Sequence, residues 1–145
     1  MTYQIDQSGK VEDTNKLTVV AYANGKIKSV KIGSVEKQKL LAAMRDLDYS
    51  KRNYLYKIFA ALIYFLLSDE KVDSVVIDRE YFGHEAIIKG MIIQLLNKNR
   101  KNVPEIQFDF IGKSSRAHKA ALDVFRGDVE ADLVVTAKDV LKLIY

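Results

Sequence analysis

Two aspartates each end a short strand-like segment: Asp6 in "YQIDQSG" and Asp78 in "SVVIDREYFG". If these strands are parallel neighbours, both carboxylates lie at the carboxyl ends of the strands, where ligand sites of mixed α/β sheets gather. Two close carboxylates repel each other unless a cation such as Mg²⁺ lies between them. Two such ions about 4 Å apart support phosphodiester cleavage. The alternative is that each aspartate only shapes the turn after its strand.

A helix near the C-terminus offers two further candidates, His118 and Asp123 in "SRAHKAALD". At about 100° per residue, His118 lies at the edge of the apolar stripe of this helix, which consists of Ala117, Ala121 and Val124. Asp123 falls on the opposite face, where its spacing favours an ion pair with Lys119. Geometry therefore favours His118 as the third site residue, although the imidazole could also pack against the core or cap the helix.

The start of the same helix predicts an anion contact. The segment "GKSSR" combines two hydroxyls with two cations, in the order Lys113, Ser114, Ser115 and Arg116. A P-loop is excluded, because Gln107 occupies the position where its first glycine is needed. The free amides of a helix N-terminus bind phosphate, so these residues predict contact with a nucleic-acid backbone. The alternative is a well-capped helix start without a ligand.

The composition is that of a globular domain with a mild positive charge. The 145 residues are 48% apolar and 29% charged, and the formal net charge is +4, which permits a polyanionic partner. Basic residues gather at 97–101, and tyrosines alternate with Lys and Arg over 49–57. This interleaving suits contact with a nucleic-acid strand. An amphipathic helix face with core tyrosines also explains it.

The absence of cysteine excludes disulfides, zinc–thiolate sites and thiol nucleophiles. The polar N-terminus has no signal-peptide pattern, so we expect a cytoplasmic protein. The most apolar run, residues 55–67, is too short to cross a bilayer and contains Lys57. It predicts a buried helix, and we expect no membrane partner.

The elements that position these residues follow from periodicity and turn signals. Strands are expected at 2–6, 17–23, 26–32, 73–78 and 105–111. A hairpin turn is expected at Asn24-Gly25. A first helix is expected at 34–47 and a second one that ends near Leu67. Further helices are expected at 84–98, 115–125 and 138–144. Ser34 is expected to cap the first helix and either Asp48 or Ser50 the second, while residues 132–137 form a short segment of no assigned type.

This element order predicts a single α/β domain over residues 1–145. A meander of three antiparallel strands followed by right-handed crossovers gives a five-stranded mixed sheet in the order 3-2-1-4-5, with helices on both faces. Strand 1, which carries Asp6, then lies at the centre beside strand 4, which carries Asp78. The two carboxylates are thereby expected at one edge of the sheet.

With Asp6 closing strand 1 and Asp78 closing strand 4, the chain resembles the ribonuclease H-like superfamily, and most closely its RuvC-type resolvase branch. The likeness covers most of the chain at the level of topology, and "FIGKSSRAHKAALDVF" resembles the strand-5-to-helix region of that group. The resemblance implies a nuclease in which Asp6 and Asp78 hold Mg²⁺ or Mn²⁺, with His118 or Asp123 completing the site. DNA or RNA would be the partner, and a homodimer is left open.

Two other functions remain open. The glutamate that ribonuclease H carries on a helix has no clear counterpart, since Glu36 fits ordinary solvated surface and Glu80 is the remaining substitute. This departure favours a catalytically inactive member of the fold that acts as a nucleic-acid or protein adaptor. The other alternative is an unrelated α/β domain, such as an oligomeric scaffold with turn-forming aspartates.

Overall fold

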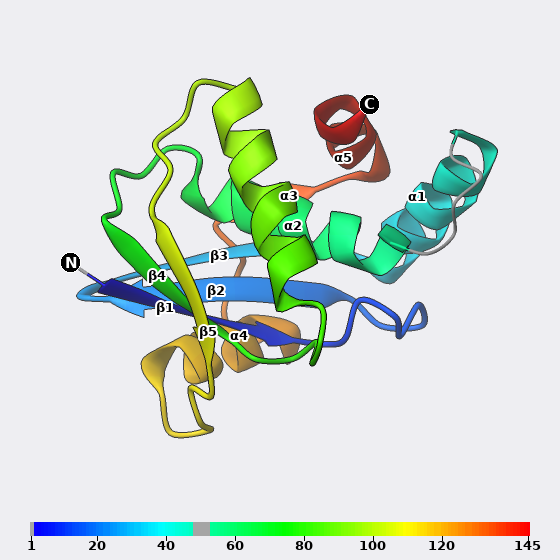
Figure 1. The fold of residues 1–145 in the computed structure, drawn as a ribbon. Coiled ribbons are helices and arrows are strands. Elements are labelled where there is room, and N and C mark those ends of the chain that lie inside the picture. Colours follow the sequence, from blue (N-terminus) through cyan, green and yellow to red (C-terminus); the bar gives the residue numbers. More distant parts are fainter. Residues whose placement is uncertain (1, 48–52) are drawn as a thin grey trace.

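The computed structural model describes residues 2–47 and 53–145, and these residues form one mixed sheet with helices on both faces (Figure 1). The expected α/β class is confirmed, but the sheet has six strands instead of five, in the order β5-β4-β1-β2-β3-β6. The strands are β1 (Thr2–Ser8), β2 (Thr18–Asn24), β3 (Lys26–Ile32), β4 (Ser74–Asp78), β5 (Glu105–Asp109) and β6 (Leu133–Val135). The helices are α1 (Ser34–Leu47), α2 (Tyr54–Leu67), α3 (Glu85–Lys98), α4 (Arg116–Phe125) and α5 (Ala137–Ile144).

The first three strands form the expected antiparallel meander. Gly25 makes the turn between β2 and β3 with φ of +70°, a conformation that favours glycine. Helical crossovers then make the remaining neighbours parallel: β1 pairs with β4, with Ile5 opposite Ile77, and β4 pairs with β5, with Asp78 opposite Asp109. The carboxyl ends of β1, β4 and β5 therefore lie at the same edge of the sheet.

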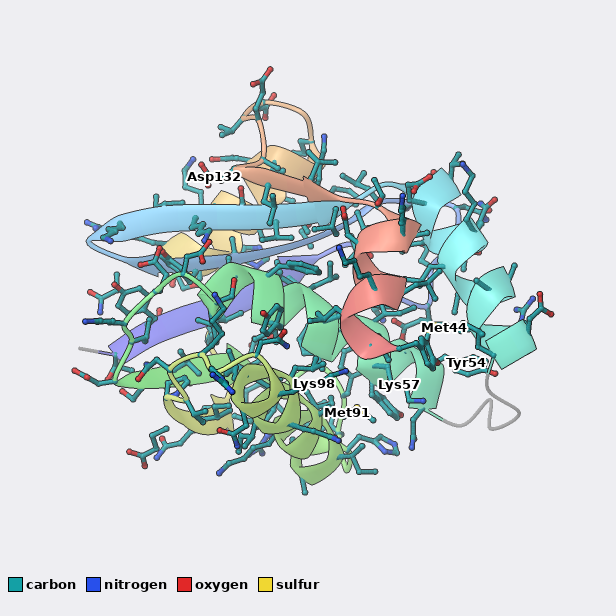
Figure 2. All side chains as sticks on the ribbon, turned by 90° about the horizontal axis from the view of Figure 1, so that it is seen from above. Met44, Tyr54, Lys57, Met91, Lys98 and Asp132 are labelled. Atoms are coloured by element: carbon teal, nitrogen blue, oxygen red, sulfur yellow. The ribbon has the colours of Figure 1, made fainter. Side chains whose placement is uncertain are left out.

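The sixth strand comes from the segment at 132–137 that the sequence left unassigned. Leu133–Val135 pairs parallel with Val30–Ile32 of β3. Asp132, labelled in Figure 2 where the chain enters β6, accepts hydrogen bonds from the backbone N–H of Ser29 at 2.8 Å and from the Ser29 hydroxyl. A segment of three residues is too short to show a strand pattern. Its place in the sheet depends instead on a partner strand about one hundred positions earlier in the chain.

The two faces of the sheet are covered unequally, as Figure 1 shows: α1, α2, α3 and α5 lie on one face and α4 lies on the other. The larger core fills the first face, where Ile58, Leu62 and Leu66 of α2 are fully buried against the strands. Under α4, a smaller core joins Ala120, Ala121 and Val124 to Val19 and Ala21 of β2. Both faces of the central strands are therefore withdrawn from water.

The start of helix α1 differs from the expectation. Helix α1 begins at Ser34, so Ser34 is its first helical residue, and the carbonyl of Gly33 accepts from the Lys37 N–H at 3.0 Å. Helix α2 begins at Tyr54, and its candidate caps Asp48 and Ser50 lie outside the described residues. Over residues 2–47 and 53–145, the structure contains no helix with the length and apolar character that a membrane span requires.

Candidate functional site

Asp6 lies on the α4 face of the central strand β1. Side chains alternate between the faces of a strand, and Tyr3 and Ile5 pack into the larger core. Asp6 therefore faces the other side, where α4 covers it and leaves 6% of the residue exposed. A carboxylate this deeply buried requires polar partners.

The partners of Asp6 are a backbone amide and an imidazole. Its Oδ1 accepts from the N–H of Gln7 at 2.7 Å, and its Oδ2 lies 3.0 Å from Nδ1 of His118. Burial raises the pKa of Asp6 above its usual range, and the nearby negative charge of Asp78 raises it further. The bonds from Gln7 and His118 act in the opposite direction, but burial is the largest effect.

The first turn of α4 holds His118 against Asp6. Ser115 is the N-cap of this helix, and its Oγ accepts from the backbone N–H of His118 at 3.0 Å. The close approach of α4 also depends on Gly9, where φ is +79° and an added Cβ would lie 2.7 Å from Phe125 of α4. The pairing of His118 with Asp6 thus follows from a capped helix seated tightly on β1 and β2.

Asp78 ends β4 beside Asp6, because the residues immediately before them, Ile5 and Ile77, are paired. Its Oδ1 accepts from the backbone N–H of Ile111 at 3.0 Å, which ties the segment after β5 to the end of β4. The structure therefore brings Asp6, Asp78 and His118 to one edge of the sheet. These are three of the four side chains predicted as catalytic.

The sequence argument missed Asp109 in "QFDF". It pairs in register with Asp78, so β4 and β5 both end in an aspartate. Strand β1 runs two residues past the end expected at Asp6, to Ser8. Phe108 packs against the larger core, and alternation places Asp109 on the same face as Asp6 and Asp78. Its Oδ1 accepts from the N–H of Phe110 at 2.8 Å. The available signal was the recurrence of an aspartate at the end of an apolar strand pattern.

Asp123, the fourth predicted catalytic residue, forms the ion pair expected from helical spacing. Its Oδ2 lies 2.9 Å from Nζ of Lys119, whose side chain is 76% exposed. Asp123 therefore forms an i,i+4 pair on the surface of α4. Among the residues predicted to bind phosphate, Ser115 caps α4, whereas Lys113, Ser114 and Arg116 are exposed near its start.

The other polar candidates have structural partners. Glu36 accepts from the N–H of Ala137 at 2.9 Å, which fixes the start of α5. Tyr54 is 5% exposed and belongs to the core. Tyr56 is half-buried, and it packs against Tyr81 and stacks on His84. Lys57 of the interleaved pattern lies with its Nζ 5.7 Å from the ring centroid of Tyr145. The other members, Tyr49, Lys51 and Arg52, lie outside the described residues.

The site offers fewer metal ligands than a complete metal centre. Among the described residues, no group of three or more His, Asp and Glu side chains is placed to hold a metal ion. The negative charge of Asp6 nonetheless lies buried beside that of Asp78, and a cation is what relieves such repulsion. The carboxylate oxygens of Asp6 and Asp78 are of the type that binds hard divalent ions, which also take water and phosphate oxygens as ligands.

No family model matches this chain, and a search of curated proteins finds no match either. The α/β class comes from the structure itself. A fold alone does not determine an activity. Function must therefore be argued from the residues at the ends of β1 and β4 and at the start of α4.

Proposed function

We propose that this chain is a ribonuclease H-like protein that hydrolyses phosphodiester bonds of nucleic acid with Mg²⁺ or Mn²⁺. The observation that carries the proposal is the buried contact between Asp6 and His118, at the carboxyl end of β1 and beside Asp78. The strand neighbours β3-β2-β1-β4-β5 support this fold assignment. The additional strand β6 extends the sheet at its far edge, away from the site.

Asp6 and Asp78 would hold the divalent ion, which when bound supplies positive charge that activates water and stabilises the leaving oxygen. Within the chain, Asp6 orients the imidazole of His118 through Nδ1. This leaves Nε2 as the ring nitrogen for proton transfer, and the His118 side chain is 27% exposed. A histidine so held can take a proton from water or give one to a leaving oxygen.

Substrate phosphate would be bound at the start of α4. Lys113 and Arg116 are exposed there, and the helix N-terminus favours negative charge. Because His118 lies in the first turn of the same helix, a phosphate bound at this end is held close to the proposed proton carrier. Lys113 and Arg116 would position the nucleic-acid backbone through its phosphates, and such contacts do not discriminate between base sequences.

The test is cleavage of labelled single-stranded, duplex and branched DNA and of RNA, with Mn²⁺, Mg²⁺ or EDTA. We expect metal-dependent cleavage that Asp6→Asn and Asp78→Asn abolish and that the matched surface variant Asp123→Asn retains. Mn²⁺ should also raise the melting temperature, because an ion at 100 times its Kd adds about 2.7 kcal/mol of stability. Cleavage by Asp6→Asn at the wild-type rate would remove this residue from the mechanism.

The second candidate function is an inactive adaptor of the same fold that binds nucleic acid. The absence of a three-ligand group among the described residues favours it. The adaptor predicts binding that weakens steeply with salt and that is the same in Mn²⁺ and EDTA, without cleavage. The same set of experiments therefore separates the two functions.

A further inference from the structure

Two phenylalanines lie exposed and in contact beside the candidate site. Phe82 is 61% exposed and Phe110 is 68% exposed, and their ring centroids are 5.8 Å apart with the planes tilted by 49°. Phenylalanine is among the residues most often buried. Two neighbouring rings in water therefore indicate a surface that contacts a partner.

The chain fixes both rings next to the carboxylates. Phe110 directly follows Asp109 and donates its N–H to that side chain, and the next N–H, from Ile111, binds Asp78. Phe82 follows Asp78 by four residues, within the connection from β4 to α3. Backbone bonds thus hold Phe110 at the strand ends that carry the proposed site, and Phe82 lies beside it through the ring contact.

Positive charge adjoins the aromatic pair. The guanidinium of Arg79 lies 5.9 Å from the ring centroid of Phe110, and its Nη2 donates to the carbonyl of Phe108 at 3.4 Å. Within the described part of the chain, the buried Nε of Arg79 has no hydrogen-bond partner. Arg79 also lines an open groove of about 450 Å³ between α3 and β5, to which Lys89 contributes a second cation.

The aromatic pair does not line this groove, but Arg79 lines it and also lies over the ring of Phe110, so the two surfaces adjoin. Glu85 also lines it, but both of its carboxylate oxygens accept from the N–H of Gly83, at 2.9 and 3.1 Å. Aromatic faces bind bases by stacking, whereas neighbouring cations bind the phosphates between them. Bases inside a duplex are already stacked, so only unpaired bases can reach the rings.

We propose that Phe82 and Phe110 stack on an unpaired base of the substrate, while Arg79 and Lys89 contact the adjoining phosphates. This inference rests on the proposed function and names its substrate class: a single strand, or a junction with splayed bases. The aromatic pair binds the strand to one side of the scissile phosphate. The residues at the start of α4 bind it on the other side.

The experiment measures binding in EDTA, so that cleavage plays no part. The ligands are a single-stranded oligonucleotide containing 2-aminopurine and its duplex. Each is titrated with wild type and with the double variant Phe82→Leu/Phe110→Leu. The control is Ile87→Ala, which changes an exposed apolar residue that lies on α3. We expect the double variant to bind the single strand about tenfold more weakly, with less than a twofold change for the duplex. Wild type and the control should quench the fluorescence of 2-aminopurine in the bound single strand, and the double variant should not.

Three results would overturn the inference: unchanged single-strand affinity in the double variant, equal losses for single strand and duplex, or a change confined to self-association in sedimentation. Lys89→Gln should lower the salt-dependence slope for the single strand by about 0.7, and an unchanged slope removes Lys89 from the phosphate contact.

If wild type binds no nucleic acid, the proposed function fails as well. If wild type cleaves and the double variant binds normally, only the stacking role fails.

Discussion

Replacing Lys37 by methionine should destabilise the protein, because this lysine is fully buried and holds the connection between β1 and β2. Its side chain on α1 is 0% exposed. The Nζ donates to the carbonyls of Lys10 and Asp13, at 3.2 and 2.7 Å, and to the hydroxyl of Thr18 at 3.0 Å. Methionine keeps the apolar stem and removes all three bonds.

The magnitude follows from two opposing effects. Each hydrogen bond from a charged donor contributes about 1.5–3 kcal/mol, whereas burying an ammonium group costs several kcal/mol. The carbonyls of Lys10 and Asp13 belong to a surface connection and can regain bonds to water. We therefore expect a loss of about 2–4 kcal/mol in the free energy of unfolding, which corresponds to about 6–12 °C in melting temperature for a chain of this length.

Urea unfolding at pH 7 measures this loss, with Lys39→Met as the matched control. Lys39 lies on the same helix with its side chain 66% exposed, and it pairs with Glu36 at 3.3 Å. An exposed pair contributes about 0–1 kcal/mol, so the control should stay close to wild type. If Lys37→Met is as stable as Lys39→Met, the three bonds do not outweigh the cost of burial and the reasoning is wrong.

Wild type and Lys37→Met should also differ in how their stability depends on pH. Burial lowers the pKa of Lys37, although Asp13 and Glu12 partly oppose this effect. As pH rises toward the unfolded-state pKa of 10.5, the folded state releases the proton of Lys37 before the unfolded state does. Stability therefore rises with pH through this group. The advantage of wild type over Lys37→Met should widen as the pH rises toward 10.5, whereas an advantage that narrows would contradict the sign.

Three further substitutions test the packing around the site and the added strand. Gly9→Ala should cost at least about 2 kcal/mol in urea unfolding, because its Cβ would lie 2.1 Å from the carbonyl of Leu17 and 2.7 Å from Phe125; a stable variant would refute the close approach of α4. Thr136→Ala should cost about 1 kcal/mol, since it removes the capping box of α5. Asp132→Ala should speed amide hydrogen exchange in β6, while unchanged protection would show that its bonds to β3 are dispensable.

Local sequence patterns determined most of the elements. The alternation in "KIKSVKI" and the turn at Asn24-Gly25 act within a few residues, and β3 and its hairpin are present as expected. The apolar run that ends in Leu67 similarly predicts a buried helix, as observed for α2. The order of strands and crossovers then placed Asp6 and Asp78 on parallel neighbours. Periodicity was sufficient here because each signal lies within a single element or its turn.

The tertiary structure decided which side chains meet. Helical spacing could place His118 at the edge of a stripe, but only the seating of α4 over Gly9 brings it within 3.0 Å of Asp6. Strand pairing between distant segments also created β6 and aligned Asp109 with Asp78. Lys37 similarly follows a surface-like pattern in "EKQK", yet it is buried by a connection more than twenty residues earlier in the chain. The sequence by itself determined which residues lie on which element, because that depends on neighbours along the chain. Contacts, burial and pKa depend on neighbours in space, and these were decided only when the sheet and its helices packed together.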